Sequence, residues 1–357
     1  MAPSLGIPAG LPHLVHDAFL RAKAAGDLSF FPTQVALLRV HGVPFQLRFA
    51  PSLAKKPKSG GDKTDKGTSK PFDPFADPPP GLLILPKVGD SGNSTHRLVL
   101  NKFAISQDHS ILATSNFRQQ THLLEASDLA AAYACIEAYH QQGEELYVFY
   151  NSGTHSGASQ PHRHLQLLPV ARIQEGLLGG PQFGKESGKT AGGTLVDQLA
   201  WTSVELPIYV ATARLPDSSS VSAASLYEIY LRLYRQACAA AANTSAMITA
   251  GDTVDTASEE RGTIPARLSY NLALTRKSMG IIPRAAEGSS VTPDGGMLSL
   301  NGTVLAGTAL VKSEAEWDAL RSDPSRLEDV LLRIGVPLPT AVAKSSKVQQ
   351  QDGKAPL

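Results

Sequence analysis

Cysteine is scarce in this sequence, and so are long apolar runs and any excess of one charge. The chain has 357 residues and two cysteines, Cys135 and Cys238, both in alanine-rich stretches. Two such cysteines do not make a disulfide framework or a zinc knuckle, and we expect both to be small buried residues in a reducing compartment. No apolar run approaches the ~18 residues that a membrane span requires. A formal net charge of +1 supplies no basic field for nucleic acid.

The first 26 residues lack the cationic start and the unbroken apolar stretch of a signal peptide. With 42% hydrophobic residues, the chain is able to bury one large core or two medium ones. We therefore expect a soluble protein of the cytoplasm, and also of the nucleus, without a membrane or nucleic-acid partner.

Two segments of biased composition divide the chain. Residues 54–81 are rich in Lys, Gly, Asp and Pro, which predicts an exposed, mobile loop at about residues 55–80. Residues 176–193 are rich in glycine and show little periodicity. The sequence thus predicts an N-terminal domain at 1–175, a C-terminal domain at 195–342 and a polar tail at 343–357.

Strand-like and helix-like segments are mixed in both halves. Alternating or continuous apolar residues predict strands at 45–49, 82–85, 96–105, 109–117, 145–153, 164–170, 205–215, 269–284 and 301–312. Helices are predicted from Ser127 or Asp128 to Gly143, from a capping box at Ser225 and Glu228, and after Ser313 and Pro324. Several hairpin-like pairs favour an α+β fold over a doubly wound α/β sheet.

The stretch SGASQPHRHLQLLP, residues 156–169, carries two histidines one residue apart. On a strand, side chains alternate, so His162, His164 and Gln166 share one face. The small residues before Pro161 allow backbone N–H groups to approach a ligand, and such groups beside imidazoles suit a phosphate oxygen. Spacing alone equally allows two histidines on a half-exposed strand with no role.

Two other ligand sites are less well supported. A zinc site would need a third ligand, and Gln166 is a poor one, so His155 would have to supply it. Residues 184–190, GKESGKT, end like a Walker A motif, but Phe183 stands where its first glycine belongs.

Residues 151–166, NSGTHSGASQPHRHLQ, resemble the active-site signature of the nucleotidyltransferase branch of the histidine-triad superfamily. Two families share that pattern: the hexose-1-phosphate uridylyltransferases and the diadenosine tetraphosphate phosphorylases, also called ATP adenylyltransferases. The stretches FDPFADP, LVLNKFAISQDHSILAT, QTHLLEASDLAAAYAC, YNLALTRKSMGIIPR and LNGTVLAGTALVKSEAEWDAL resemble the phosphorylases. The likeness covers nearly all of residues 15–336. One departure is Ser278, where that family often has Trp.

The resemblance implies a histidine-triad-like α+β fold: a mainly antiparallel sheet with flanking helices, in two related halves that complete a site as a monomer. It implies phosphorolysis of diadenosine tetraphosphate to ADP and ATP, and the reverse, with His164 as the nucleophile that carries the adenylyl group. It implies Mg²⁺ bound with the polyphosphate and no fixed protein metal site. The residues expected to contact nucleotide or phosphate are Lys56 (rather than Lys55), Asn101, Lys102, Asn151, Gly157, Ala158, Ser159, Gln160, His162, Gln166, Thr275 and Arg284.

The sequence leaves two other functions open. A uridylyltransferase-like sugar enzyme would share only the histidine loop. A protein that binds dinucleoside polyphosphates without turnover would not need His164 and Gln166 intact. Adenylyl transfer from ADP to sulfate is also undecided, and for Arg276 and Asn271 the sequence does not separate a structural role from binding.

Overall fold

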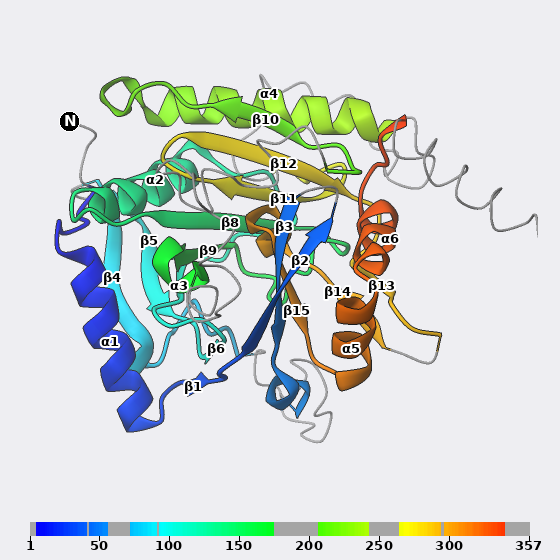
Figure 1. Cartoon of the computed structure of the whole chain (residues 1–357). Coiled ribbons are helices and arrows are strands. Elements are labelled where there is room, and N and C mark those ends of the chain that lie inside the picture. Colours follow the sequence, from blue (N-terminus) through cyan, green and yellow to red (C-terminus); the bar gives the residue numbers. More distant parts are fainter. Residues whose placement is uncertain are drawn as a thin grey trace, which may run out of the picture.

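A computed structural model gives the fold (Figure 1). It describes residues 5–40, 43–55, 72–90, 93–174, 206–242, 264–293 and 296–339. Most of the loop predicted at 55–80, the glycine-rich stretch, the Walker-like residues 184–190 and the polar tail therefore lie outside the described residues. Lys56 lies outside them too.

The centre of the molecule is a sheet of eight described strands, each antiparallel to its neighbours. Its strand order is β10 (Ala211–Arg214), β12 (Ser278–Arg284), β11 (Ser269–Leu274), β8 (Leu146–Ser152), β9 (His164–Pro169), β7 (Ser110–Thr114), β5 (Asn93–Leu100) and β4 (Leu83–Asp90). Strands from the C-terminal half thus extend the sheet begun by the N-terminal half. The α+β architecture expected from the sequence is confirmed.

Three helices cover one face of this sheet (Figure 1): α1 (Leu11–Ala25), α2 (Ala126–His140) and α4 (Ala223–Ala242). We call it the helical face. Leu226, Tyr230, Leu233 and Ala237, the predicted apolar stripe of α4, are buried there. The helix starts before the predicted box, because the Ser222 hydroxyl accepts from the Ser225 amide and so provides the cap.

The opposite face carries His164 and Gln166, and we call it the histidine face. It is covered in part by a three-stranded sheet of β15 (Thr308–Val311), β3 (Val43–Phe49) and β2 (Gln34–Val40). The two C-terminal helices, α5 (Glu314–Ser322) and α6 (Ser325–Ile334), pack beside it (Figure 1). The predicted cap of α5 is confirmed, since the Ser313 side chain accepts from the Glu316 amide.

Short elements join these layers. They are β1 (Ser29–Phe30), β6 (Phe103–Ala104), β13 (Gly288–Ser290), β14 (Met297–Ser299), α3 (Val170–Gln174), and the 3-10 turns η1 (Pro51–Lys55), η2 (Pro80–Leu82), η3 (Ser218–Ser220) and η4 (Gly302–Ala306). The strand predicted at 301–312 is wrong in its first half, because Asn301 caps η4 and Gly307, at φ +61°, ends it. The strand predicted at 205–215 is shorter in the structure, where β10 joins the large sheet and Ile208 forms an isolated bridge with Pro337.

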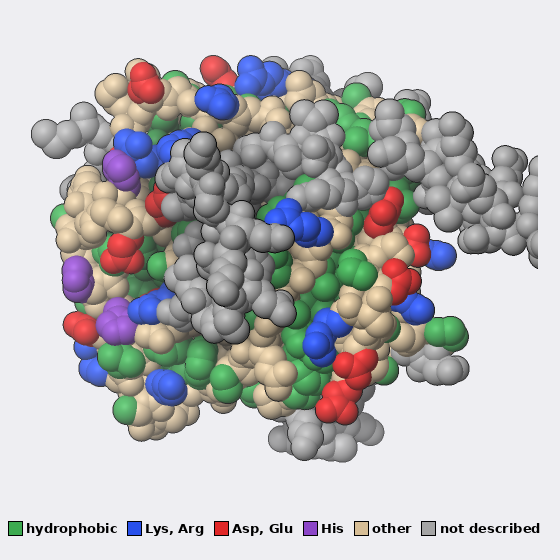
Figure 2. Space-filling model, viewed as in Figure 1, with side chains coloured by type: hydrophobic (Ala, Val, Ile, Leu, Met, Phe, Trp, Pro, Cys, Tyr) green, Lys and Arg blue, Asp and Glu red, His purple; other side chains and the backbone are tan. Residues whose placement is uncertain are grey.

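Burial explains why the central strands read as apolar runs. Every residue of β8 is buried, since both faces of that strand are covered. Cys135 is buried in α2, where burial raises the pKa of its thiol to about 12, and Cys238 is half-buried; both are free thiols. No helix among the described residues is long and apolar enough to cross a membrane. Acidic and basic side chains are interspersed over the face seen in Figure 2.

Candidate active site

The two histidines stand at the entry of β9, in the middle of the large sheet. His164 pairs with Ala113 of β7, and Gln166 pairs with Ile111 of β7 and Phe149 of β8. Leu165 and Leu167 point into the core of the helical face. Strand alternation therefore sets His164 and Gln166 on the histidine face, as the sequence predicts.

The loop that leads to this strand depends on two glycines. Gly153 and Gly157 have φ of +88° and +78°, a region that favours glycine. A Cβ on Gly157 would also lie 2.9 Å from the Cβ of Asn301. The loop is thus pressed against η4, and Ser156 inside it is fully buried.

His164 has a defined tautomer. Its Nδ1 lies 2.7 Å from the carbonyl oxygen of His162, which only accepts, so Nδ1 carries the proton. Burial lowers the pKa of His164 to about 4 and outweighs the effect of that hydrogen bond, so the ring is neutral near pH 7. Its Nε2 consequently holds an unshared electron pair, which is what a nucleophile needs.

His162 serves a different purpose. Its Nδ1 lies 2.7 Å from Oδ2 of Asp73, and its Nε2 lies 2.9 Å from the carbonyl oxygen and 3.0 Å from Oγ1 of Thr114. Burial acts to raise the pKa of Asp73, but hydrogen bonds from the Phe75 amide and from His162 hold it below its ordinary value. Because both of its ring nitrogens lie within hydrogen-bonding distance of other groups, His162 ties the entry of β9 to Asp73 and Thr114.

The segment around Asp73 corrects the sequence prediction of an exposed loop that runs to about residue 80. Phe75 is 5% exposed, and its ring centroid lies 4.8 Å from that of His164 and 5.8 Å from that of His162. Composition identified a polar segment, but this end of it packs on the histidines through one aromatic ring and one carboxylate. Asp73 and Phe75 are therefore site residues that the sequence reasoning missed, although they belong to the quoted FDPFADP stretch.

Gln120 is another missed residue. Its Nε2 donates to the carbonyl oxygens of Asn151 (2.8 Å) and His164 (3.2 Å), and its Oε1 accepts from the amide of His164 (2.8 Å). This buried amide joins the end of β8 to the start of β9, where the glycine loop separates them. No short sequence pattern predicts that Gln120 links the two strands, because all of its partners are distant in sequence.

A buried ionic cluster supports the strand from behind. Between the two histidines, Arg163 points to the helical face, where Nη1 donates to Oε1 of Glu125 (2.9 Å) and Oδ2 of Asp128 (3.0 Å). Asp128 also lies 2.8 Å from Nε2 of His96. Burial acts to raise the pKa of Asp128, but His96 and Arg163 hold it below its ordinary value. The start of α2 is thereby tied to Arg163 at the entry of β9.

An open pocket of about 630 Å³ adjoins His164. Its apolar wall includes Phe75, Leu82, Val99 and Ile111, which suits the flat face of a base. Its polar wall brings together six residues expected from the sequence: Asn101, Lys102, Ser159, Gln160, His164 and Gln166. Gly157 and Ala158 lie in the adjoining loop and do not line this pocket.

Three residues that the sequence analysis considered as ligand contacts instead make contacts within the protein: Asn151, Asn271 and Arg284. Oδ1 of Asn151 accepts from Nδ2 of Asn271 (2.9 Å) and from the Gly302 amide (2.8 Å), joining β8 to β11 and η4. Arg284 is fully buried: Nη1 donates to Oδ1 of Asn271, and Nη2 donates to the carbonyl oxygens of Ala286, Glu287 and Leu300. Burial lowers the pKa of Arg284 to about 9.

Thr275 lies at the other end of β11, away from the histidines. Its hydroxyl oxygen accepts from the amides of Lys277 and Ser278 and so closes the β11–β12 hairpin. Arg276 donates to Oε1 of Glu137 and to Oγ of Ser218, which makes its contacts structural. The structure therefore does not bring Thr275, Arg276 or Arg284 to His164.

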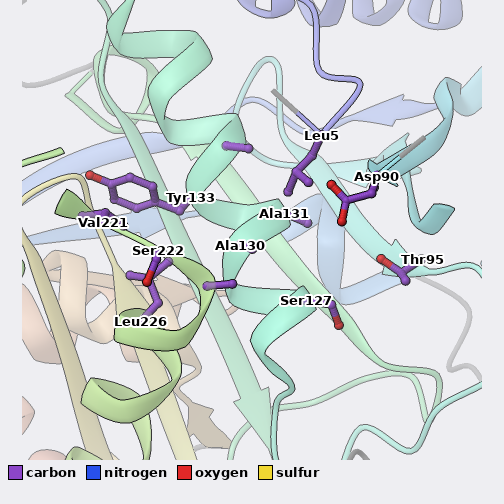
Figure 3. Close-up of a pocket in the computed structure, with 13 residues that line it drawn as sticks. Leu5, Asp90, Thr95, Ser127, Ala130, Ala131, Tyr133, Val221, Ser222 and Leu226 are labelled. Carbon is purple, nitrogen blue, oxygen red and sulfur yellow. The ribbon is translucent and has the colours of Figure 1, made fainter. Parts of the chain in front are cut away.

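A second pocket, of about 280 Å³, opens on the helical face between α2, the start of α4 and β4 (Figure 3). Alanines of α2 with Leu5, Val221 and Leu226 make it mostly apolar, and Asp90, Thr95 and Ser127 add a few oxygens. None of its lining residues belongs to β9. Among the described residues, no group of three or more His, Cys, Asp and Glu side chains is placed to hold a metal ion.

Comparisons with known proteins agree with this geometry. Residues 5–178 match the family model of the Ap4A phosphorylase N-terminal domain, and residues 204–337 match that of the ATP adenylyltransferase C-terminal domain. The Saccharomyces cerevisiae diadenosine 5′,5‴-P1,P4-tetraphosphate phosphorylase 2 is 31% identical over 93% of this chain and 96% of that protein. The yeast protein APA1 is 27% identical over the same shares. The crystal structure of yeast Ap4A phosphorylase Apa2 in complex with Ap4A superposes with a TM-score of 0.66 at 27% identity, over 92% of this chain and 97% of that one.

Proposed function

The chain belongs to the Ap4A phosphorylase family of nucleotidyltransferases, and from this we propose that it splits diadenosine tetraphosphate with inorganic phosphate into ADP and ATP. The same two steps run in reverse would join ADP and ATP. The observation that carries the proposal is the tautomer of His164: a neutral, buried ring with Nδ1–H donating to the His162 carbonyl and Nε2 free to attack.

In the first step, Nε2 of His164 attacks the α-phosphorus of the dinucleotide. The N–P bond forms as the bond to the bridging oxygen breaks, and ATP leaves with that oxygen. The attacked adenylyl group remains on His164. The hydrogen bond from Nδ1 to the His162 carbonyl stabilises the positive charge that develops on the imidazole ring.

The negative charge on the transferred phosphate needs hydrogen-bond donors on the side of the phosphate away from His164. The backbone amides of residues 157–160 and the hydroxyl of Ser159 are exposed or half-exposed beside the pocket that contains His164. Preorganised donors of this kind stabilise a transition state because they need no reorganisation during the reaction. We propose that Mg²⁺ accompanies the polyphosphate, since this cation is commonly bound through substrate phosphate oxygens.

In the second step, an oxygen of inorganic phosphate attacks the adenylyl phosphorus, the N–P bond breaks and ADP forms. Gln166 stands two residues beyond His164 on the same face. An amide donates to a phosphoryl oxygen but does not take a proton from water. This supports transfer to phosphate over hydrolysis.

The nucleotide contacts follow from the pocket. We propose that one adenosine lies against Phe75 and the neighbouring apolar wall, with Asn101 and Lys102 at its edge. Lys56, Thr275 and Arg284 remain predictions as ligands, and the contacts of Thr275 and Arg284 described above favour structural roles for both.

The test is incubation of the full chain with diadenosine tetraphosphate, with and without inorganic phosphate, followed by analysis of the nucleotides. We expect steady formation of ADP and ATP only when phosphate is present. Without phosphate, ATP should appear in at most one equivalent per enzyme. Rapid release of AMP without phosphate would instead identify a hydrolase, and no ATP under either condition would identify a binding protein without turnover.

A further inference from the structure

A third, smaller cavity shares Gln166 with the open pocket beside His164. Its volume is about 70 Å³, and it sits between the large sheet, β3 and the 3-10 turn η4. Gln166 lines both spaces, so the small cavity adjoins the pocket that contains His164. One water needs only ~10–15 Å³, so the cavity has room for one four-oxygen anion.

One wall of this cavity presents a donor with no partner. Nδ2 of Asn101 lies 3.1 Å from Nδ1 of His109, while Oδ1 of Asn101 accepts from the Phe103 amide and so fixes the orientation of the amide. Nδ1 of His109 is therefore an acceptor, and in a neutral ring Nε2 carries the hydrogen. Burial lowers the pKa of His109 to about 4, which keeps the ring neutral. His109 is 6% exposed, and its Nε2 has no partner with hydrogen-bond geometry among the described residues, although the side chain of Gln166 lies near enough to act against the fall in its pKa.

A second buried donor without a partner lines the same cavity. Ser106 is 8% exposed, lines the same cavity, and its Oγ has no partner in the part of the chain that the structure describes. Buried polar groups in native proteins nearly always have partners, so two unsatisfied donors on one small cavity indicate a ligand that accepts hydrogen bonds.

The remaining lining fits an anion. Arg48 brings a guanidinium from β3, while Asn301 and Thr303 add polar groups from η4. No acidic side chain is found among the described residues that line this cavity. Hydrogen-bond donors near a cation, without a carboxylate, are the surroundings that a phosphate oxygen requires.

We propose that this cavity, with the Ser106 hydroxyl and Nε2–H of His109 as donors, binds the inorganic phosphate that accepts the adenylyl group. The proposal rests on the proposed function for the role of that phosphate. From this position one oxygen of hydrogen phosphate attacks the phosphorus of adenylyl-His164. The new P–O bond forms as the N–P bond breaks, and its electron pair returns to Nε2. The proton of the phosphate stays on the β-phosphate of the ADP formed.

The test separates the two half-reactions in the full-length protein. Ser106→Ala removes one donor without adding bulk, Ser106→Thr restores a hydroxyl, and His109→Phe removes the other donor. Thr292→Val is the matched control, because Thr292 has a buried, unpartnered Oγ1 but lines neither cavity. The measurements are the KM for phosphate, single-turnover ATP release without phosphate, and calorimetric binding of inorganic phosphate to the unreacted protein.

We expect Ser106→Ala to raise the KM for phosphate about tenfold or more and to weaken phosphate binding equally, since a hydrogen bond to an anion is lost. Single-turnover ATP release should stay within about twofold of wild type. Ser106→Thr should recover most of the loss, and Thr292→Val should behave as wild type. His109→Phe should likewise weaken phosphate binding, which gives an independent result if the serine variant does not fold.

An unchanged KM for phosphate in folded Ser106→Ala and His109→Phe would overturn the proposal, as would equal slowing of both half-reactions. The calorimetry distinguishes this failure from failure of the proposed function. If the wild type releases no ATP, the proposed function fails, and phosphate binding that Ser106→Ala weakens would still support the cavity as an anion site. If the wild type does release ATP but Ser106→Ala binds phosphate normally, only the cavity proposal fails.

Discussion

Acidification tests the neutral nucleophile directly. Because burial lowers the pKa of His164 to about 4, about 97% of the ring is neutral at pH 5.5, against about 9% for a histidine with the ordinary pKa of ~6.5. Single-turnover release of ATP, measured by rapid quench without phosphate, should therefore fall less than about twofold between pH 8 and pH 5.5. Phosphate is left out because inorganic phosphate changes its own ionisation between these two pH values and would add a titration to the second step. A tenfold fall centred near pH 6.5, in protein that circular dichroism shows to be folded, would refute the buried-neutral assignment.

The same shift predicts how stability depends on pH. The folded state keeps His164 neutral, whereas the unfolded chain takes up a proton below pH ~6.5, so stability is fully present above that pH and is lost as pH falls towards 4. Between pH 8 and pH 5 the loss is about 2 kcal/mol for this residue. His109, whose pKa burial also lowers to about 4, should add a similar loss. Urea denaturation of wild type and His164→Asn at both pH values measures this contribution, and equal losses in the two proteins would contradict it.

Three further predictions concern the site and its loop. After exposure to α-labelled substrate, His164→Asn should carry no acid-labile, alkali-stable label, and its turnover should be at least ~10³-fold lower. His162→Asn should keep the label. Label that survives only in the His164 variant would reverse the assignment of the nucleophile. Gly157→Ala should lower the midpoint of urea unfolding more than Gly143→Ala. Both glycines have positive φ, but only at Gly157 would a Cβ lie 2.9 Å from a neighbouring atom. Equal losses would show that the loop shifts to accommodate the Cβ. Asp73→Ala should raise the KM for the dinucleotide about tenfold, because it removes the acceptor that holds the Phe75 amide; an unchanged KM would show that Phe75 keeps its place without Asp73.

Local patterns in the sequence predicted most elements of the fold. The apolar run of β8 and the stripes of α4 and α6 match the structure because burial dictates period and composition in each. The strand predicted at 96–105 ends at Leu100 in β5, and Phe103 and Ala104 form the separate strand β6, which pairs with β1. The sequence did not predict the 3-10 turn η4, since residues 302–306 are as apolar as a strand, and the cap at Asn301 becomes effective only in its folded position. The sequence also did not predict that strands from both halves form one sheet, because local periodicity does not specify which strands pair.

The sequence by itself determined the placement of His164 and Gln166 on one strand face, the glycine loop before them, and the family to which they point. These are matters of spacing and residue type, which strand alternation and the conformational freedom of glycine translate directly into geometry. Only the tertiary structure decided that His162 pairs with Asp73, that Gln120 joins the two strands, and that Arg284 is held by backbone carbonyls instead of facing the ligand. Each of these depends on a contact between segments distant in the chain, and such contacts exist only once packing has excluded water and fixed which polar groups meet.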